Sequence, residues 1–123
     1  MERPTVVIAN SDSTRCAVLA RGLHEHARGV IVASSSDELR SAIREHCPQV
    51  VIADLETVPL GSISGLRDEF NNLTVVCTHR VPDEQMWAAS LDAGASDCCS
   101  SGDVEDVVRA ALGIPYRVRT QAA

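Results

Sequence analysis

The sequence has few aromatic residues: tryptophan, tyrosine and phenylalanine occur once each among its 123 residues. Proteins that bind a flavin usually stack it on aromatic rings, so this scarcity argues against a flavin-dependent redox protein. The sequence also lacks an apolar run long enough to cross a membrane, and its N-terminus lacks the apolar segment of a signal peptide. We therefore expect a cytoplasmic protein that has no association with membranes.

Positive charge is also scarce. There are 11 lysine and arginine residues against 17 acidic ones, which gives a formal net charge of −6. The basic residues are scattered among acids and form no run. A chain that binds nucleic acid directly needs a basic surface to neutralise phosphates. We therefore expect no direct binding of nucleic acid.

The five cysteines form no Cys-x-x-Cys motif, and their number is odd: Cys16, Cys47, Cys77, Cys98 and Cys99. Three of them fall inside apolar, strand-like runs. This pattern favours reduced thiols in a cytosolic protein over a disulfide framework. Neighbouring residues on a strand point to opposite faces, so Cys98 and Cys99 are poorly placed to share a disulfide or a metal. We interpret the cysteines as small apolar residues of the core.

Strand-like and helix-like segments alternate along the chain. The predicted strands are residues 5–9, 29–33, 50–54, 73–77 and 95–100, and the predicted helices are 14–26, 36–43, 64–70, 82–93 and 103–112, with a loop at 57–62. The strands are apolar without alternation, which indicates a parallel sheet covered on both faces. We predict a single α/β domain with a doubly wound, five-stranded parallel sheet of order 2-1-3-4-5 and five helices, which is the flavodoxin-like architecture.

Polar residues end three of these strands. Asp54 follows the apolar run 50–53, Thr78 follows the run 73–77, and the run 5–9 leads into Asn10, Ser11 and Asp12. In open α/β sheets, ligands bind beyond the carboxyl ends of parallel strands. We therefore expect the polar groups at these strand ends to converge on one site.

The order of these motifs resembles that of two-component response-regulator receiver domains. The resemblance rests on residues 6–11, 51–55, 75–79 and 91–97, and the most family-specific match is the Ala-Gly-Ala-x-Asp motif at 93–97. It covers residues 4–113, and residues 114–123 form a tail or a linker. It implies a signalling protein rather than an enzyme. In this family a histidine kinase supplies a phosphoryl group to the aspartate at the position of Asp54, and the hydroxyl at the position of Thr78 responds to it.

Other positions of the family site differ here. Two acids that hold Mg²⁺ in the family correspond to Asn10 and Ser11, and the phosphoryl-binding lysine corresponds to Ser101. Mg²⁺ prefers charged oxygen ligands, so Asp54 would be the main metal ligand. Asp12 could assist it, although its position also suits the N-cap of the following helix. For Asp12 the N-cap role is the favoured interpretation, and we expect no cofactor, or weakly bound Mg²⁺.

The sequence leaves three functions open. The first is an atypical receiver, a pseudo-receiver that acts through protein–protein contacts with weak or absent phosphorylation. The second is a working phosphoacceptor that uses Asp54 with Mg²⁺, and the third is a flavodoxin-like redox or cofactor protein.

The expected partners are proteins, among them a histidine kinase and a fused or separate effector domain. Trp87 lies on the helix at 82–93, where it could either pack in the core or be exposed on the face formed by that helix, the strand at 95–100 and the helix at 103–112. Receivers use this face for dimers and partners, so the resemblance implies a possible homodimer through it.

Overall fold

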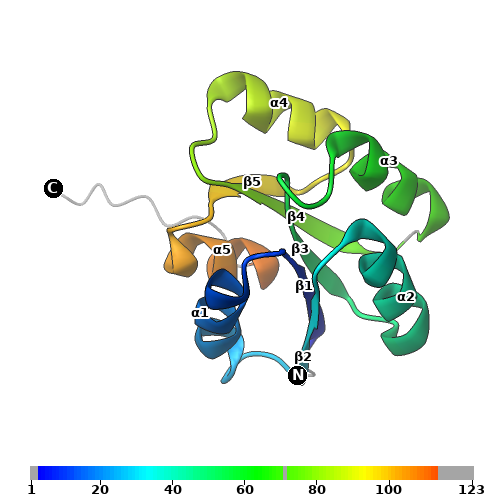
Figure 1. The fold of residues 1–123 in the computed structure, drawn as a ribbon, viewed down its shortest axis with the longest axis vertical. Helices are drawn as coiled ribbons and strands as arrows, with labels where there is room; N and C mark the ends of the chain where they lie inside the picture. Colours follow the sequence, from blue (N-terminus) through cyan, green and yellow to red (C-terminus); the bar gives the residue numbers. More distant parts are fainter. Residues whose placement is uncertain (1–2, 71, 114–123) are drawn as a thin grey trace, which may run out of the picture.

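A computed structural model describes residues 3–70 and 72–113 and confirms the predicted architecture (Figure 1). The elements are β1 (Thr5–Ala9), α1 (Ser13–Leu23), β2 (Gly29–Ala33), α2 (Ser36–His46), β3 (Val50–Asp54), α3 (Leu60–Glu69), β4 (Thr74–His79), α4 (Glu84–Asp92), β5 (Asp97–Ser100) and α5 (Val104–Ala111). All strand pairs are parallel, and the sheet has the order β2-β1-β3-β4-β5.

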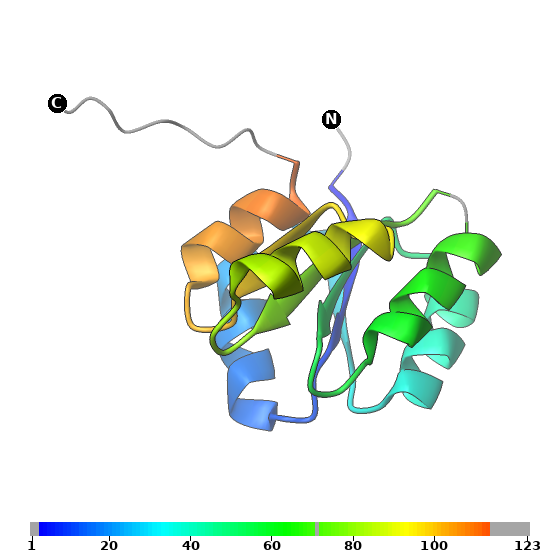
Figure 2. The same ribbon diagram turned by 90° about the horizontal axis from the view of Figure 1, so that it is seen from above.

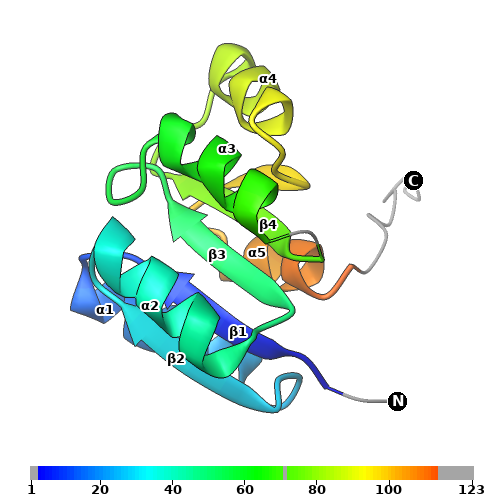
Figure 3. The ribbon, with the colours of Figure 1, turned by 90° about the vertical axis from the view of Figure 1, so that its right-hand side faces the viewer.

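Helices cover both faces of the sheet, as the unbroken apolar strands predict. Figure 2 shows α1 and α5 together on one side, and Figure 3 shows α2 and α3 in front of the strands, with α4 above them. Along β1 the side chains alternate: Val7 belongs to the core beneath α2 and α3, and Val6 and Ile8 belong to the core beneath α1 and α5. Two apolar cores therefore hold the sheet between two helical layers.

The cysteines follow the same two-sided arrangement. Cys77 and Cys98 lie in the core beneath α2, α3 and α4, whereas Cys16 and Cys99 lie in the core beneath α1 and α5. All five are free thiols, and Cys47 alone is exposed. Burial raises the pKa of the Cys77 and Cys99 thiols to about 12. The prediction that Cys98 and Cys99 face opposite sides of the strand is confirmed, and four of the five cysteines act as core residues.

Short polar residues begin four of the helices. The side chains of Asp12, Ser35, Asp83 and Asp103 accept hydrogen bonds from backbone N–H groups in the first turns of α1, α2, α4 and α5. These N–H groups have no partner within the helix, so each cap satisfies donors that would otherwise be left free. At the other end of α4, Gly94 adopts φ +109°, a left-handed conformation that suits glycine and confirms the predicted stop.

Several predicted boundaries are wrong by two residues or more, among them the end of α2, which is at His46 rather than at residue 43, and the end of β4, which is at His79 rather than at residue 77. Helix α3 begins at Leu60 rather than at residue 64, because Ile63 and Leu66 bury one of its faces and outweigh the low helix propensity of Gly61 and Ser62. Helix α1 ends at Leu23, after which a turn leads to β2. Strand β5 begins at Asp97, two residues later than expected.

Within residues 3–70 and 72–113, no helix is both long and apolar enough to cross a membrane. The predicted tail at 114–123 lies outside the described residues.

Candidate functional site

Asp54 and Thr78 end neighbouring strands and lie side by side. They are direct partners in the register of β3 and β4, and the Thr78 hydroxyl donates a hydrogen bond of 2.9 Å to Asp54 Oδ1. Both residues are buried, with exposed fractions of 5% for Asp54 and 1% for Thr78. The ends of β3 and β4 therefore meet as predicted, through a buried hydrogen bond.

The second carboxylate oxygen of Asp54 also has a partner. The Glu56 backbone N–H donates to Asp54 Oδ2 over 3.2 Å. The loop turns tightly at this point, because the N–H groups of Thr57 and Val58 both donate to the Asp54 carbonyl oxygen. Both oxygens of the buried carboxylate thus accept hydrogen bonds from the protein itself, which is what a buried charge requires.

Asn10, the first of the two residues that the resemblance would align with acids, is buried just past the end of β1. Its Oδ1 accepts a hydrogen bond of 2.9 Å from the Asp12 backbone N–H, and its own N–H donates to the Ala33 carbonyl. The Cys16 thiol donates to the Asn10 carbonyl oxygen over 3.2 Å. The amide oxygen of Asn10 therefore stabilises the turn into α1.

Ser11, the second of these residues, is hydrogen-bonded to the loop that follows Asp54. The Ser11 backbone N–H donates to Thr57 Oγ1 over 3.0 Å, and the Thr57 hydroxyl donates to Ser11 Oγ over 3.3 Å. These two bonds join the loop after β1 to the loop after β3. Nothing in the sequence pattern marked Thr57 for this role, because the contact depends on how the two loops meet.

Asp12 is the N-cap of α1. Its Oδ1 accepts hydrogen bonds from the backbone N–H groups of Thr14 and Arg15, over 3.0 and 3.1 Å. The side chain is exposed. Of the two roles that the sequence allows, the capping role accounts for these contacts, and Asp12 would have to leave the cap to bind a metal beside Asp54.

Ser101, which the resemblance would align with the lysine of receivers, is buried just past the end of β5, with an exposed fraction of 2%. Its backbone N–H donates to the His79 carbonyl over 2.9 Å. The His79 ring accepts a hydrogen bond from the Val81 backbone through Nδ1, over 3.1 Å. These residues bring the ends of β4 and β5 together without placing a cation there.

The oxygen donors at this edge fit Mg²⁺ poorly. Asp54 supplies one carboxylate, while the amide oxygen of Asn10 and the hydroxyl of Ser11 already take part in hydrogen bonds between the loops. Mg²⁺ needs near-octahedral oxygen coordination, usually with one or two carboxylates. Among the residues that the structure describes, no three histidine, cysteine, aspartate or glutamate side chains gather into a group that could hold a metal ion.

An ion pair lies across the same edge of the sheet and was not predicted. Arg80 Nη2 lies 2.7 Å from Glu56 Oε2. The two residues stand at matching positions, each two residues beyond the register pair formed by Asp54 and Thr78. The register places the two residues opposite each other, but whether their side chains meet depends on the conformations of the two loops.

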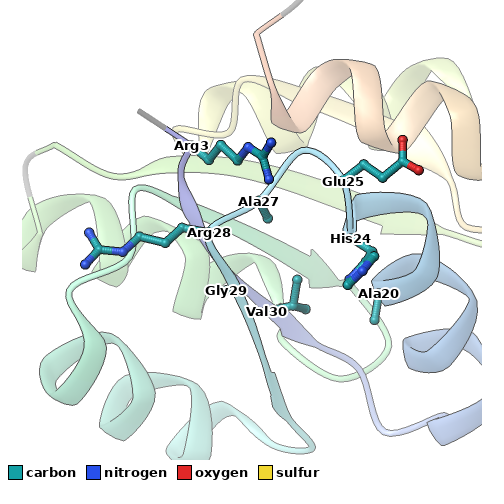
Figure 4. Close-up of a pocket in the computed structure, with 8 residues that line it drawn as sticks. All are labelled: Arg3, Ala20, His24, Glu25, Ala27, Arg28, Gly29 and Val30. Carbon is teal, nitrogen blue, oxygen red and sulfur yellow. The ribbon is translucent and has the colours of Figure 1, made fainter. Parts of the chain in front are cut away.

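Surface pockets lie at both ends of the sheet. A cleft of about 480 Å³ adjoins the site and is lined by Leu55, Pro59, Leu60, His79, Asp83, Gln85 and Met86. A larger, open pocket of about 750 Å³ lies around the end of α1 and the start of β2, far from Asp54, and Figure 4 shows the residues that line it. In that pocket Arg28 extends away from His24, so its basic groups do not converge on one point.

Trp87 is half-exposed on α4, with an exposed fraction of 48%. Its indole N–H donates to Asp97 Oδ1 at the start of β5, over 3.3 Å. This places the ring on the surface between α4 and β5 rather than in the core. Half-exposed tryptophan is common in protein interfaces, because it combines a large apolar area with one polar group.

Solved structures of receiver domains share this fold. The signal receiver domain of the response regulator NarL from Mycobacterium tuberculosis superposes with a TM-score of 0.83 at 17% sequence identity, over 92% of this chain and 96% of that one. The receiver domain of the Francisella response regulator 1452 gives a TM-score of 0.81 at 16% identity, over 91% and 96% of the two chains. The response regulator RcsB from Salmonella typhimurium gives 0.79 at 14% identity, over 98% of this chain and 65% of that chain.

No family model matches the sequence, and no curated protein matches it. The chain therefore has the fold of a response-regulator receiver domain, on the strength of its structure. At these identities the likeness shows the fold alone. The chemistry of the site follows from this chain's own residues, which are Asp54, Thr78, Asn10, Ser11 and Ser101.

Proposed function

We propose that this protein is an atypical receiver, a signalling module that passes on its signal mainly by binding another protein and whose phosphorylation at Asp54 is weak or absent. The observation that carries the proposal is the state of Asp54. Both of its oxygens are hydrogen-bonded within the protein, by the Thr78 hydroxyl and the Glu56 N–H. A carboxylate in this state needs neither a metal nor a phosphoryl group to be stable where it is buried.

The charges at the site support the same proposal. Transfer of a phosphoryl group depends on positive groups that stabilise the negative charge of the transition state. Asn10, Ser11 and Ser101 supply no charge where the family has two metal-binding acids and a lysine. The sequence contains no lysine at all, so no lysine of this chain can take that place.

The partner is a protein, and the surface between α4 and β5 is the expected place of contact. The half-exposed ring of Trp87 supports this expectation, as does the resemblance to receivers, which implies dimers or effector contacts on the face formed by α4, β5 and α5. The protein has no reaction of its own in this scheme. It responds to whichever molecule stabilises one of its conformations.

The alternative function is a working phosphoacceptor, which the Thr78–Asp54 hydrogen bond favours, because the responding hydroxyl already touches the acceptor. The experiment that separates the two treats the protein with acetyl phosphate and Mg²⁺ and measures intact mass. In parallel, Trp87 fluorescence follows a titration with Mg²⁺ and beryllofluoride. Asp54→Asn is the control.

We expect phosphorylation of the wild-type protein to be slow and incomplete, or not to occur. Rapid, nearly complete phosphorylation that disappears in Asp54→Asn would overturn the proposal and establish the phosphoacceptor function.

A further inference from the structure

The Glu56–Arg80 ion pair joins the two loops that flank Asp54. Glu56 belongs to the loop after β3, and Arg80 belongs to the loop after β4. Their side chains are well exposed, at 44% for Glu56 and 73% for Arg80. An exposed ion pair contributes little to stability, so the Arg80 guanidinium would lose little on exchanging Glu56 for another anion.

Arg80 also lies within electrostatic reach of Asp54. The hydrogen bond and charge of Glu56 raise the pKa of Arg80 above its ordinary value, and the charge of Asp54 adds to that effect. Arg80 begins two residues beyond Thr78, whose hydroxyl contacts Asp54 directly. The strand end that contacts Asp54 thus leads directly into a residue that carries a guanidinium.

We propose that Arg80 is the cation of this site: it leaves Glu56 and binds the phosphoryl group when Asp54 accepts one. Arg80 would thereby supply from the end of β4 the charge that Ser101 cannot supply from the end of β5. The proposal rests on the proposed function in its weaker form, in which Asp54 is phosphorylated slowly.

The covalent step balances with acetyl phosphate as the donor. One oxygen of the Asp54 carboxylate attacks phosphorus, the bond between phosphorus and the acetate oxygen breaks, and acetate leaves with that electron pair. The product is an acyl phosphate on Asp54. No proton has to move, because the nucleophile and the leaving group are both carboxylates. The negative charge on the transferred oxygens is what Arg80 would stabilise.

The exchange of partners follows from charge and shape. A phosphoryl group on Asp54 carries up to two negative charges, whereas Glu56 carries one. The planar guanidinium forms paired hydrogen bonds with phosphate oxygens as readily as with a carboxylate. The phosphoryl group is therefore the stronger partner, and its arrival would release Glu56 and change the contact between the two loops.

The experiment measures the rate of phosphorylation by acetyl phosphate, by intact mass, in wild type, Arg80→Ala, Glu56→Gln and the double variant. We expect Arg80→Ala to slow phosphorylation about tenfold, the typical weight of one charged hydrogen bond. We expect Glu56→Gln to speed it severalfold, because Arg80 is then held less firmly. In the double variant, the faster phosphorylation expected of Glu56→Gln should vanish, because Arg80 is absent. If the removal of a negative charge alone were the cause, the faster rate would remain.

Matched controls are present in the chain. Arg44 and Glu69 form an ion pair of the same length, 2.7 Å, between α2 and α3. Arg44→Ala and Glu69→Gln should leave the rate unchanged. Arg15, in the first turn of α1, is the other arginine near this edge, and Arg15→Ala should have little effect.

Beryllofluoride affinity gives a second readout that does not depend on turnover. We expect Arg80→Ala to weaken it by a similar factor and Arg80→Lys to restore part of it. The proposal for Arg80 is overturned if Arg80→Ala matches wild type, if Arg15→Ala carries the effect instead, or if wild type and Glu56→Gln are both silent. If neither protein is phosphorylated, the proposed function still stands and only the role of Arg80 is overturned. Rapid phosphorylation at a rate that does not depend on Arg80 would overturn both the proposed function and the role of Arg80.

Discussion

The middle and the flanks of the sheet differ at its carboxyl edge. On β3 and β4, Asp54 and Thr78 are buried and bonded to each other. Past β1 and β5, Asn10, Ser11 and Ser101 are uncharged and serve the backbone and the loops. Because both oxygens of Asp54 already accept hydrogen bonds within the protein, the pair of Asp54 and Thr78 is stable without phosphate. The presence of an aspartate and a threonine at these positions therefore does not by itself indicate a phosphoacceptor.

The largest effect, an increase in the phosphorylation rate, is expected from introducing charged residues past the ends of β1 and β5. The triple variant Asn10→Asp, Ser11→Asp and Ser101→Lys should increase phosphorylation by acetyl phosphate and Mg²⁺ by about a hundredfold or more, since each charged contact contributes about 1.5–3 kcal/mol. It should also lower the free energy of unfolding without Mg²⁺ by about 1–2 kcal/mol, because the new acids repel Asp54.

Intact mass and urea unfolding with and without Mg²⁺ measure the two effects of this triple variant. A variant that folds and still resists phosphorylation would show that the missing charges are not the obstacle.

A smaller effect is expected from removing the hydrogen bond between Thr78 and Asp54 in the middle of the sheet. Thr78→Val removes the hydroxyl that donates to Asp54 Oδ1 and leaves a buried carboxylate one donor short. We expect the free energy of unfolding to fall by about 1–3 kcal/mol in urea at neutral pH. Thr74→Val, at the start of the same strand, is the matched control and should change it much less. Equal losses in both variants would contradict a special role for the Thr78–Asp54 bond.

The smallest effect tests the two roles of Asp12. Asp12→Ala removes the cap of α1 and should reduce the free energy of unfolding by about 1 kcal/mol, as should Asp103→Ala at the cap of α5. Asp12→Asn keeps a capping oxygen and should preserve most of the stability. If Asp12→Asn also weakens Mg²⁺ binding, measured by calorimetry, then Asp12 is a metal ligand as well as a cap.

The sequence was sufficient for the fold and for the meeting of Asp54 with Thr78. Strand order and parallel pairing follow from the apolar runs and their alternation with helices, and the two strand ends must then be neighbours. The start of α3 was missed because Gly61 and Ser62 are typical of loops, while burial of Ile63 and Leu66 decides the outcome.

The contacts between loops could not be predicted in the same way. The Ser11–Thr57 bonds and the Glu56–Arg80 pair join residues 46 and 24 positions apart in the sequence, between loops that have no periodic pattern. Their formation depends on side-chain conformations that the order of elements does not determine. The capping role of Asp12, in contrast, is local and was one of the two roles that its position allowed.

The distribution of the cysteines allows thiol labelling to report which part of the protein opens. In the folded state a thiol reagent meets Cys47 first, because the other four thiols are buried. Cys77 and Cys98 become reactive when the layer of α2, α3 and α4 lifts from the sheet, and Cys16 and Cys99 when α1 and α5 do so. The order in which these two pairs are labelled, with and without a binding partner, would show which layer of the protein opens when the partner binds.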